Sequence, residues 1–217
     1  MPIKVPDHLP ALETLNAEQV DVMPQEMAVR QDIRPLKLLL LNLMPKKRDT
    51  EIQFARLFGN TPLQIEMILM TTASYTPRNT ETGYLRRFYR QLDDVRDEYF
   101  DALIVTGAPI ETLPFEEVNY WRELSEIMDW SRTRCFRRLG ICWGAQALLW
   151  YFFKVPKHQL DSKLFGVFDH RLSHTSGRLM NGFTDRFPMP ISRYTMNRTD
   201  DIEAAGLDVL ANGVDCG

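Results

Sequence analysis

Apolar runs alternate with amphipathic segments over the central half of the chain. Residues 36–43 (LKLLLLNL) and 100–106 (FDALIVT) are almost continuously apolar, as expected of strands that are covered on both faces. Residues 63–70 begin with apolar alternation, which predicts another strand. A shorter strand is predicted from Arg138 to Cys142.

Helices are predicted between and after these strands, because apolar residues recur there at helical spacing. They lie at residues 50–58, 84–92, 115–130 and 144–153. Asp49 and Thr50 can cap the first of these helices, and Gly59 can end it. The third carries an apolar face that we expect in the core, made of Val118, Trp121, Leu124 and Met128.

The alternation of strands and helices predicts an α/β fold with a doubly wound, mostly parallel sheet. Ligands of such sheets bind outside the carboxyl ends of the strands, where Cys142 and the segment from Gly107 to Glu111 are expected. Gly107-Ala108-Pro109 breaks its strand and leaves backbone amides free, so the loop is a candidate cradle for an oxyanion. Two distant segments should therefore converge on one crevice.

The two ends of the chain have weaker patterns. Residues 1–34 are rich in prolines and predict an irregular N-terminal arm, followed by a single domain over residues 35–217. After Pro156 the periodicity fades, and strand hairpins are the best interpretation.

Composition narrows the function. The chain has 217 residues, 44% of them hydrophobic and 25% charged, enough for a sizeable core. A net charge of −3 gives no reason to expect nucleic acid or an anionic membrane as a partner. No apolar run approaches the roughly 20 residues of a membrane helix, and the first residues lack a secretory signal. We expect a soluble, cytoplasmic protein that acts on small molecules.

Cysteine usage fits a reducing compartment. The three cysteines, Cys135, Cys142 and Cys216, have no metal-ligand spacing, so neither a zinc site nor a disulfide framework is predicted.

Cys142 lies in Gly140-Ile141-Cys142-Trp143-Gly144, the pattern of a nucleophile elbow between a strand and a helix. A helix N-terminus favours a thiolate and can bind an oxyanion, with the Trp143 amide as first donor and the Ala108 amide as second. The alternative is an inert buried cysteine, which is the default for Cys135.

Several motifs carry a resemblance to a known family. GICWGAQ (residues 140–146) resembles the elbow of class I glutamine amidotransferases, which identifies that fold but not one reaction. Four more segments resemble motifs of the homoserine O-acyltransferases. They are LNLMPKKRDTEIQFARL (41–57), VTGAP (105–109), PKHQLDSKLFGVFDH (156–170) and SRY (192–194). The chain is identified as a member of that family over nearly its whole length after the arm.

The resemblance implies a class I glutamine amidotransferase-like, flavodoxin-like fold and a reaction of methionine biosynthesis. In it, an acyl group passes from coenzyme A to the hydroxyl of L-homoserine through an acyl-Cys142 intermediate, with no metal and no cofactor beyond the acyl donor. Lys163 and Ser192 match positions that contact homoserine. Glu111 matches the position where glutamate accompanies acetyl-CoA and glycine accompanies succinyl-CoA, because a carboxylate there would repel the succinyl carboxylate. The family also implies a homodimer.

The chain departs from the family in its catalytic partners. The family's general-base histidine, a glutamate close after it and a substrate-binding arginine all match positions beyond residue 217, so the chain resembles a C-terminally truncated member. None of its four histidines, His8, His158, His170 and His174, occupies the catalytic position. Two alternatives therefore stay open: a glutamine amidotransferase-like hydrolase, and a non-catalytic truncated relative whose cysteine senses redox state or binds a ligand.

Overall fold

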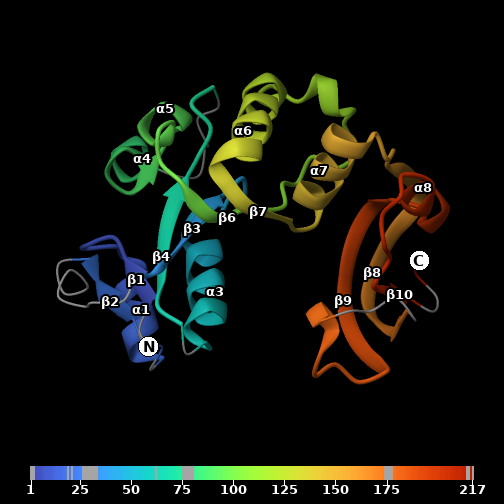
Figure 1. Ribbon diagram of the computed structural model, residues 1–217, viewed down its shortest axis with the longest axis horizontal. Helices are drawn as coiled ribbons and strands as arrows, with labels where there is room; N and C mark the ends of the chain where they lie inside the picture. The colour runs from blue at the N-terminus through green and yellow to red at the C-terminus, as the bar shows by residue number, and fades with distance from the viewer. Residues whose placement is uncertain are drawn as a thin grey trace. The chain divides into compact units, whose positions relative to one another are not determined.

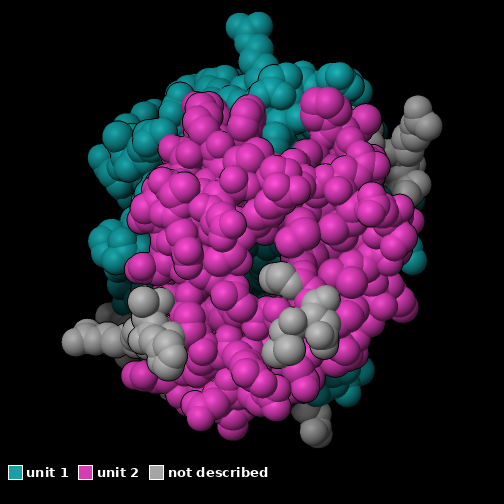
Figure 2. Space-filling view, turned by 90° about the vertical axis from the view of Figure 1, so that its right-hand side faces the viewer, with its two compact units in different colours: residues 1–109, 115–145 teal, residues 110–114, 146–217 magenta. Residues whose placement is uncertain are grey.

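A computed structural model of the chain describes residues 3–18, 20, 22–25, 34–61, 63–74, 81–173, 178–213 and 216. The chain forms two compact units, which Figure 2 colours separately. The first unit comprises residues 1–109 and 115–145, and the second comprises residues 110–114 and 146–217. This division does not coincide with the expected boundary between residues 34 and 35. That the two units form one domain stays a prediction.

A parallel sheet organises the first unit (Figure 1). Its strands are β1 (Ile3–Val5), β2 (Val22–Pro24), β3 (Leu36–Leu41), β4 (Ile65–Met70), β5 (Tyr89–Arg90), β6 (Phe100–Val105) and β7 (Cys135–Gly140). The strand order is β2-β1-β4-β3-β6-β7, with β5 paired to β4, and every pairing is parallel. The predicted fold class is confirmed. The chain order reverses between β3 and β6, so the switch point lies between these two strands.

Helices cover the sheet and supply its core. They are α1 (Ala11–Ala17), α3 (Lys47–Gly59), α4 (Thr82–Phe88), α5 (Leu92–Val95), the 3₁₀ turn η1 (Phe115–Glu117), α6 (Trp121–Arg134) and α7 (Trp143–Phe153), which continues into the second unit. On one sheet face, Leu40 pairs in register with Leu69 and Ile104. These side chains form a buried cluster with Phe54 of α3 and Phe88 of α4. The continuous apolar runs in the sequence arise because the other sheet face is covered too, as the buried Leu39, Leu41 and Leu103 show.

The N-terminal arm is more regular than predicted. β1 and β2 extend the sheet, with Lys4 in register with Glu66 of β4, and Val5 and Leu15 are almost fully buried. The prediction of an irregular arm is therefore wrong for these residues. Strands of three residues are too short to show a period of two, so their pairing is decided by the tertiary structure.

Element boundaries also differ from the predictions. Helix α3 begins at Lys47, so Asp49 and Thr50 lie in its first turn and neither caps it. Its start is fixed instead by the Lys47 ammonium, which donates to the Asn42 carbonyl. Strand β7 runs from Cys135 to Gly140 rather than from Arg138 to Cys142, because its pairing with β6 spans those residues.

The second predicted helix is shorter than expected, and its end is the two-residue strand β5. The third is divided into η1 and α6. On the third helix, Val118, Leu124 and Met128 are buried as predicted, whereas Trp121 is half-buried.

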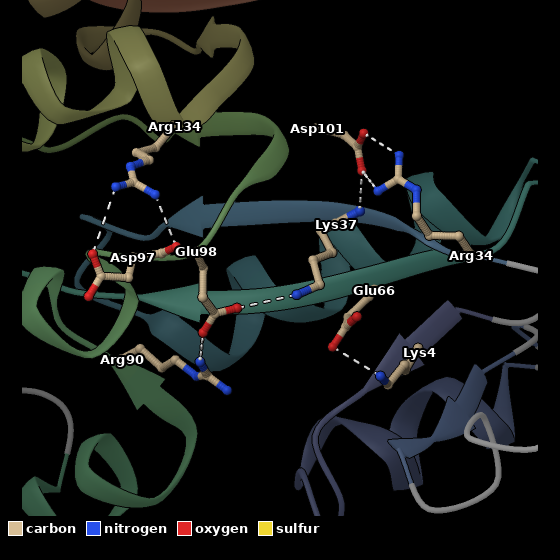
Figure 3. Close-up of polar contacts among 9 residues, drawn as sticks. All are labelled: Lys4, Arg34, Lys37, Glu66, Arg90, Asp97, Glu98, Asp101 and Arg134. Carbon is tan, nitrogen blue, oxygen red and sulfur yellow. Dashed lines mark hydrogen bonds and ion pairs between the residues drawn. The ribbon is translucent and has the colours of Figure 1, made fainter.

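Ion pairs tie the loops of the first unit to its strands (Figure 3). The Asp101 carboxylate accepts from the Arg34 guanidinium at 2.9 and 3.1 Å and from the Lys37 backbone N–H at 2.8 Å. These bonds, led by the one from Arg34, hold the pKa of Asp101 below its usual value. The remaining pairs in Figure 3 are Lys4–Glu66, Lys37–Glu98, Arg90–Glu98 and Arg134–Asp97.

An antiparallel sheet organises the second unit. Its strands are β8 (His158–Leu172), β9 (Arg186–Met196) and β10 (Ala211–Gly213), in the order β10-β8-β9, with η2 (Arg178–Met180) and α8 (Thr199–Ala204) between them. The predicted strand hairpin after Pro156 is confirmed by the β8–β9 pairing. Within the described residues, no helix combines the length and apolar character that crossing a membrane requires.

A buried polar cluster lies where α3 meets β3 and β5. The Glu51 carboxylate is fully buried and accepts from the hydroxyls of Tyr84 at 2.6 Å and Tyr89 at 2.5 Å. Lys47 is 3% exposed, and its ammonium lies 2.5 Å from the Asn42 carbonyl oxygen. Burial lowers the pKa of Lys47 to about 8 and raises the pKa of Glu51. Keeping Lys47 charged in this buried cluster therefore costs folding free energy.

Lys47 should make stability rise with pH in the alkaline range. Its folded pKa of about 8 lies below the usual 10.5, so the unfolded chain binds more protons between these values. The free energy of unfolding should increase with pH across that window, by up to about 3 kcal/mol. Urea unfolding measured from pH 7.5 to 10, with Lys47→Met as control, checks this. A wild-type curve parallel to that of the variant would contradict it.

Candidate active site

Cys142 lies on a sharp turn directly after β7 and directly before α7. Its φ of +55° is in the left-handed region, which non-glycine residues rarely adopt, and its side chain is exposed. The turn is closed by the hydrogen bonds Gly144 N–H to Ile141 O and Ala145 N–H to Cys142 O, both 3.0 Å. The structure therefore gives the sulfur the strained, accessible setting of a nucleophile elbow.

Both glycines of the G-x-C-x-G motif are required because other backbone atoms lie very close to them. A Cβ on Gly144 would lie 2.4 Å from the Val105 carbonyl oxygen, and one on Gly140 would lie 2.5 Å from the Cα of Ala145. Neither neighbour can move without displacing β6 or α7. The spacing G-x-C-x-G is thus dictated by how tightly the start of α7 packs on the sheet.

The Gly107 loop lies beside the cysteine. β6 and β7 are adjacent and in register at Val105 and Gly140, and the Ile141 N–H donates to the Val105 carbonyl at 3.0 Å. A Cβ on Gly107 would lie 3.2 Å from the Cys142 Cβ and 3.5 Å from its Sγ. Gly107 and Cys142, from the two segments predicted to converge, therefore lie side by side, whereas Glu111 at the other end of the first segment belongs to the second unit. Trp143 is the first residue of α7, and a first-turn amide has no partner in its own helix, while Ala108 directly follows Gly107 in the loop.

Thr106 positions this loop, a role that sequence reasoning missed. Its hydroxyl accepts the Leu43 N–H at 2.8 Å and donates to the Gly107 carbonyl at 3.1 Å. The hydroxyl is thereby the link between the turns that follow β3 and β6. A threonine directly before the strand-breaking Gly107 was the only available signal, because threonine is also an ordinary strand residue.

Lys163 and Ser192 share one face of the β8–β9 hairpin. Lys163 lies in an irregularity between Gln159 and Leu164, and its ammonium is 5.4 Å from the centre of the Phe165 ring and 5.5 Å from that of Tyr194. Ser192 pairs with Phe165 and lies two residues before Tyr194, so its side chain is on the same face. Both predicted substrate contacts are exposed and near each other.

Glu111 belongs to the segment 110–114 of the second unit. The Lys157 ammonium donates to the carbonyl oxygens of Glu111 and Leu113, which fixes the backbone of this segment. The Glu111 side chain is half-buried. The predicted site residues are therefore divided: Cys142, Trp143 and Ala108 lie together in the first unit, and Lys163, Ser192 and Glu111 in the second.

Two of the described histidines, His158 and His170, have structural partners. His158 Nε2 is 2.6 Å from the Asp201 carboxylate, and the buried His170 lies 3.0 Å from the Phe168 carbonyl and stacks on Phe187. His174 lies outside the described residues. No group of three or more possible metal ligands occurs in the described part of the chain.

Cys142 differs from the other two cysteines. Cys135 and Cys216 are buried, and burial raises the pKa of Cys135 to about 12, so its thiolate is disfavoured. Cys216 Sγ lies 3.9 Å from His170 Nε2. Cys142 alone among the three thiols is exposed, and the default buried setting applies to Cys135 as predicted.

This geometry defines an α/β protein with a cysteine on a nucleophile elbow at the carboxyl edge of a parallel sheet. Two solved structures share the fold. A putative GMP synthase protein from Thermoplasma acidophilum superposes with a TM-score of 0.55 at 14% identity, covering 84% of this chain and 75% of that one. The protein SMU.1228c gives a TM-score of 0.52 at 15% identity, covering 84% and 70%. The fold is that of the class I glutamine amidotransferases.

The chain belongs to the homoserine O-succinyltransferase family, whose sequence profile matches residues 2–217. It is 50% identical to a homoserine O-acetyltransferase of Clostridium beijerinckii and 47% identical to one of Acetivibrio thermocellus, over all of this chain and 72% of each relative. A homoserine O-acetyltransferase of Allorhizobium ampelinum is 51% identical over 94% of this chain and 66% of its own length. The family resemblance carried by the motifs is confirmed.

Substituting Gly144 should destabilise the first unit. In Gly144→Ala the new methyl would overlap the Val105 carbonyl, so we expect a loss of about 2 kcal/mol or more in the free energy of unfolding. Gly83→Ala is the matched control, because a Cβ at Gly83 in α4 meets nothing within 4 Å and should be neutral or slightly stabilising. Thermal and urea unfolding measure both, and equal stability of the two variants would show that the elbow is not tightly packed.

Proposed function

We propose that the chain is a homoserine O-acetyltransferase, which transfers an acetyl group from acetyl-CoA to the hydroxyl of L-homoserine in methionine biosynthesis. The observation that carries the proposal is the exposed Cys142 on its elbow, with the Gly107 loop beside its sulfur. The family is named for acyl transfer to homoserine, which supports homoserine and an acyl-CoA as the substrates. The relatives that share about 50% of their residues with this chain are named homoserine O-acetyltransferases.

The first step moves the acetyl group onto the enzyme. The Cys142 thiolate attacks the thioester carbonyl, and the carbon–sulfur bond to coenzyme A breaks as the new one to Cys142 forms. One thioester replaces another, so the acyl-enzyme keeps its reactivity. The amides of Trp143 and Ala108 are the proposed donors to the oxyanion of the tetrahedral intermediate, each contributing about 3 kcal/mol. Thr106 acts as a positioning residue for the loop that carries Ala108.

The second step moves the acetyl group to homoserine. Its hydroxyl oxygen attacks the acetyl carbon, gives up its proton and displaces the Cys142 thiolate. A base must take that proton, and we assign this role to none of the residues described above. Lys163 is the proposed partner of the homoserine carboxylate, and Ser192 of its polar groups. Their placement on one exposed hairpin face supports a shared ligand.

Glu111 is the proposed determinant of the acyl donor. The name of the family refers to succinyl transfer, whereas the similar relatives are named for acetyl transfer. A carboxylate at the acyl pocket repels the free carboxylate of a succinyl group and leaves the neutral acetyl group unaffected. Acetyl-CoA as donor, the absence of any further cofactor, a homodimeric state and a cytoplasmic location all stay predictions.

Intact-protein mass spectrometry tests the acyl-enzyme. Incubation with acetyl-CoA should add one acetyl group, which peptide mapping should place on Cys142. Cys142→Ser and the control Cys135→Ser separate the exposed thiol from the buried one, and only the first should lose the label. A glutamyl adduct formed from glutamine, with none from acetyl-CoA, would instead identify an amidotransferase, and no adduct from either would indicate a non-catalytic domain.

Removing the Glu111 carboxylate should change the donor. In Glu111→Gly, labelling of Cys142 by succinyl-CoA should become at least about tenfold faster relative to labelling by acetyl-CoA, as expected when a like-charge contact of about 1.4 kcal/mol is lost. Glu116→Gly controls for the general loss of an acidic side chain nearby in the sequence. A ratio that does not change in Glu111→Gly would remove Glu111 from donor selection.

A further inference from the structure

A cavity of about 390 Å³ lies in the first unit beside the carboxyl end of β4. Residues 71–73 after β4, together with α4, β5 and α5, contribute to its walls, and Figure 1 shows α4 and α5 near that end of the strand. The side chains that bear on its chemistry are Thr71, Thr72, Thr82, Leu85, Arg86 and Asp94. The volume is in the range of small-molecule sites.

We propose that this cavity binds the phosphorylated nucleotide end of the acyl-CoA donor. The proposal rests on the function proposed above, since it takes a coenzyme A thioester to be the substrate of Cys142.

The lining matches a phosphorylated ribose. The Arg86 guanidinium offers a planar fork of donors that suits phosphate oxygens. No ion pair among the described residues engages Arg86, whereas nearby Arg90 is bound to Glu98 at 2.6 Å. The threonine hydroxyls can donate and accept. The Asp94 carboxylate accepts the Gln91 N–H at 2.8 Å and can also accept from a ribose hydroxyl, while Leu85 provides an apolar wall for the base.

The position along the sheet fits the length of the donor. The cavity follows β4 and Cys142 follows β7, with β3 and β6 between them. Three strand spacings of about 4.8 Å separate the two points by roughly 14 Å along one edge of the sheet. Coenzyme A holds its thioester and its nucleotide at opposite ends of an extended pantetheine arm. A nucleotide site must therefore lie well away from the nucleophile on the same edge, as this cavity does.

A second cavity in the first unit serves as a control for the proposed nucleotide site. It has a volume of about 510 Å³ and runs along β4 toward β1, with Lys4, Glu66 and Arg87 in its lining. Lys4 and Glu66 neutralise each other at 3.0 Å, and the Arg87 guanidinium lies over the Phe88 ring. Arg86 borders both hollows, whereas Arg87 borders only this one. Loss of binding in an Arg86 variant but not in an Arg87 variant would therefore indicate the first cavity rather than the second.

Calorimetric titration with adenosine 3′,5′-bisphosphate tests the site on the full 217-residue chain. The wild type should bind, Arg86→Ala should bind about tenfold or more weakly, as for loss of one charge-assisted hydrogen-bonding group, and Arg86→Lys should lie between them. Arg87→Ala should match the wild type. Circular dichroism confirms that each variant is folded. No binding by the wild type, or a greater loss in Arg87→Ala than in Arg86→Ala, would overturn the proposal.

A second measurement separates this proposal from the proposed function. Arg86→Ala should slow labelling of Cys142 by subsaturating acetyl-CoA but leave labelling by acetyl-pantetheine, which lacks the nucleotide, unchanged. Equal slowing with both donors would mean that Arg86 acts on the elbow and would refute the nucleotide site. If the wild type is labelled by neither donor, acetyl transfer fails as the function, and the calorimetric comparison alone decides the cavity.

Discussion

The close approach of α7 to β6 determines how the Cys142 sulfur is presented. Because Gly144 lies against the Val105 carbonyl, the chain must reverse between β7 and α7 within two residues, and Cys142 adopts a left-handed conformation. Such strain costs about 1–3 kcal/mol and persists only where the surroundings enforce it. Here the parallel pairing of β6 with β7 and the first bonds of α7 enforce it together.

At the carboxyl edge of the sheet, hydrogen bonds connect the loops around the elbow. The turn after β3 contributes Leu43, whose N–H meets the Thr106 hydroxyl, and the loop after β6 contributes Gly107 and Ala108. Behind the turn after β3, the buried Lys47 bonds to Asn42 and fixes the start of α3. Neighbouring strands thus fix each other's loops and give the elbow a rigid frame.

The sequence was sufficient for the parts of the fold that depend on periodicity. β3, β4 and β6 were predicted because strands buried on both faces are apolar throughout, and the elbow because its glycines have a geometric cause that the structure confirms. The two-residue strand β5 and the strands of the arm were missed, since their pairing partners are remote in sequence. Thr106 was missed because its role lies in a hydrogen bond to Leu43, a contact between distant segments.

The roles of Lys163, Ser192 and Glu111 came from family resemblance alone. The structure adds that the first two share a hairpin face, a fact that no local pattern contains.

The central claim is that the sulfur of Cys142 and the amides of Trp143 and Ala108 together accept the acyl group. A crystal structure of the chain after reaction with acetyl-CoA tests it most directly. The account predicts an acetyl thioester on Cys142 whose carbonyl oxygen lies about 2.7–3.2 Å from the amide nitrogens of Trp143 and Ala108. An acetyl carbonyl turned away from both amides, or an acetyl group on another residue, would contradict it.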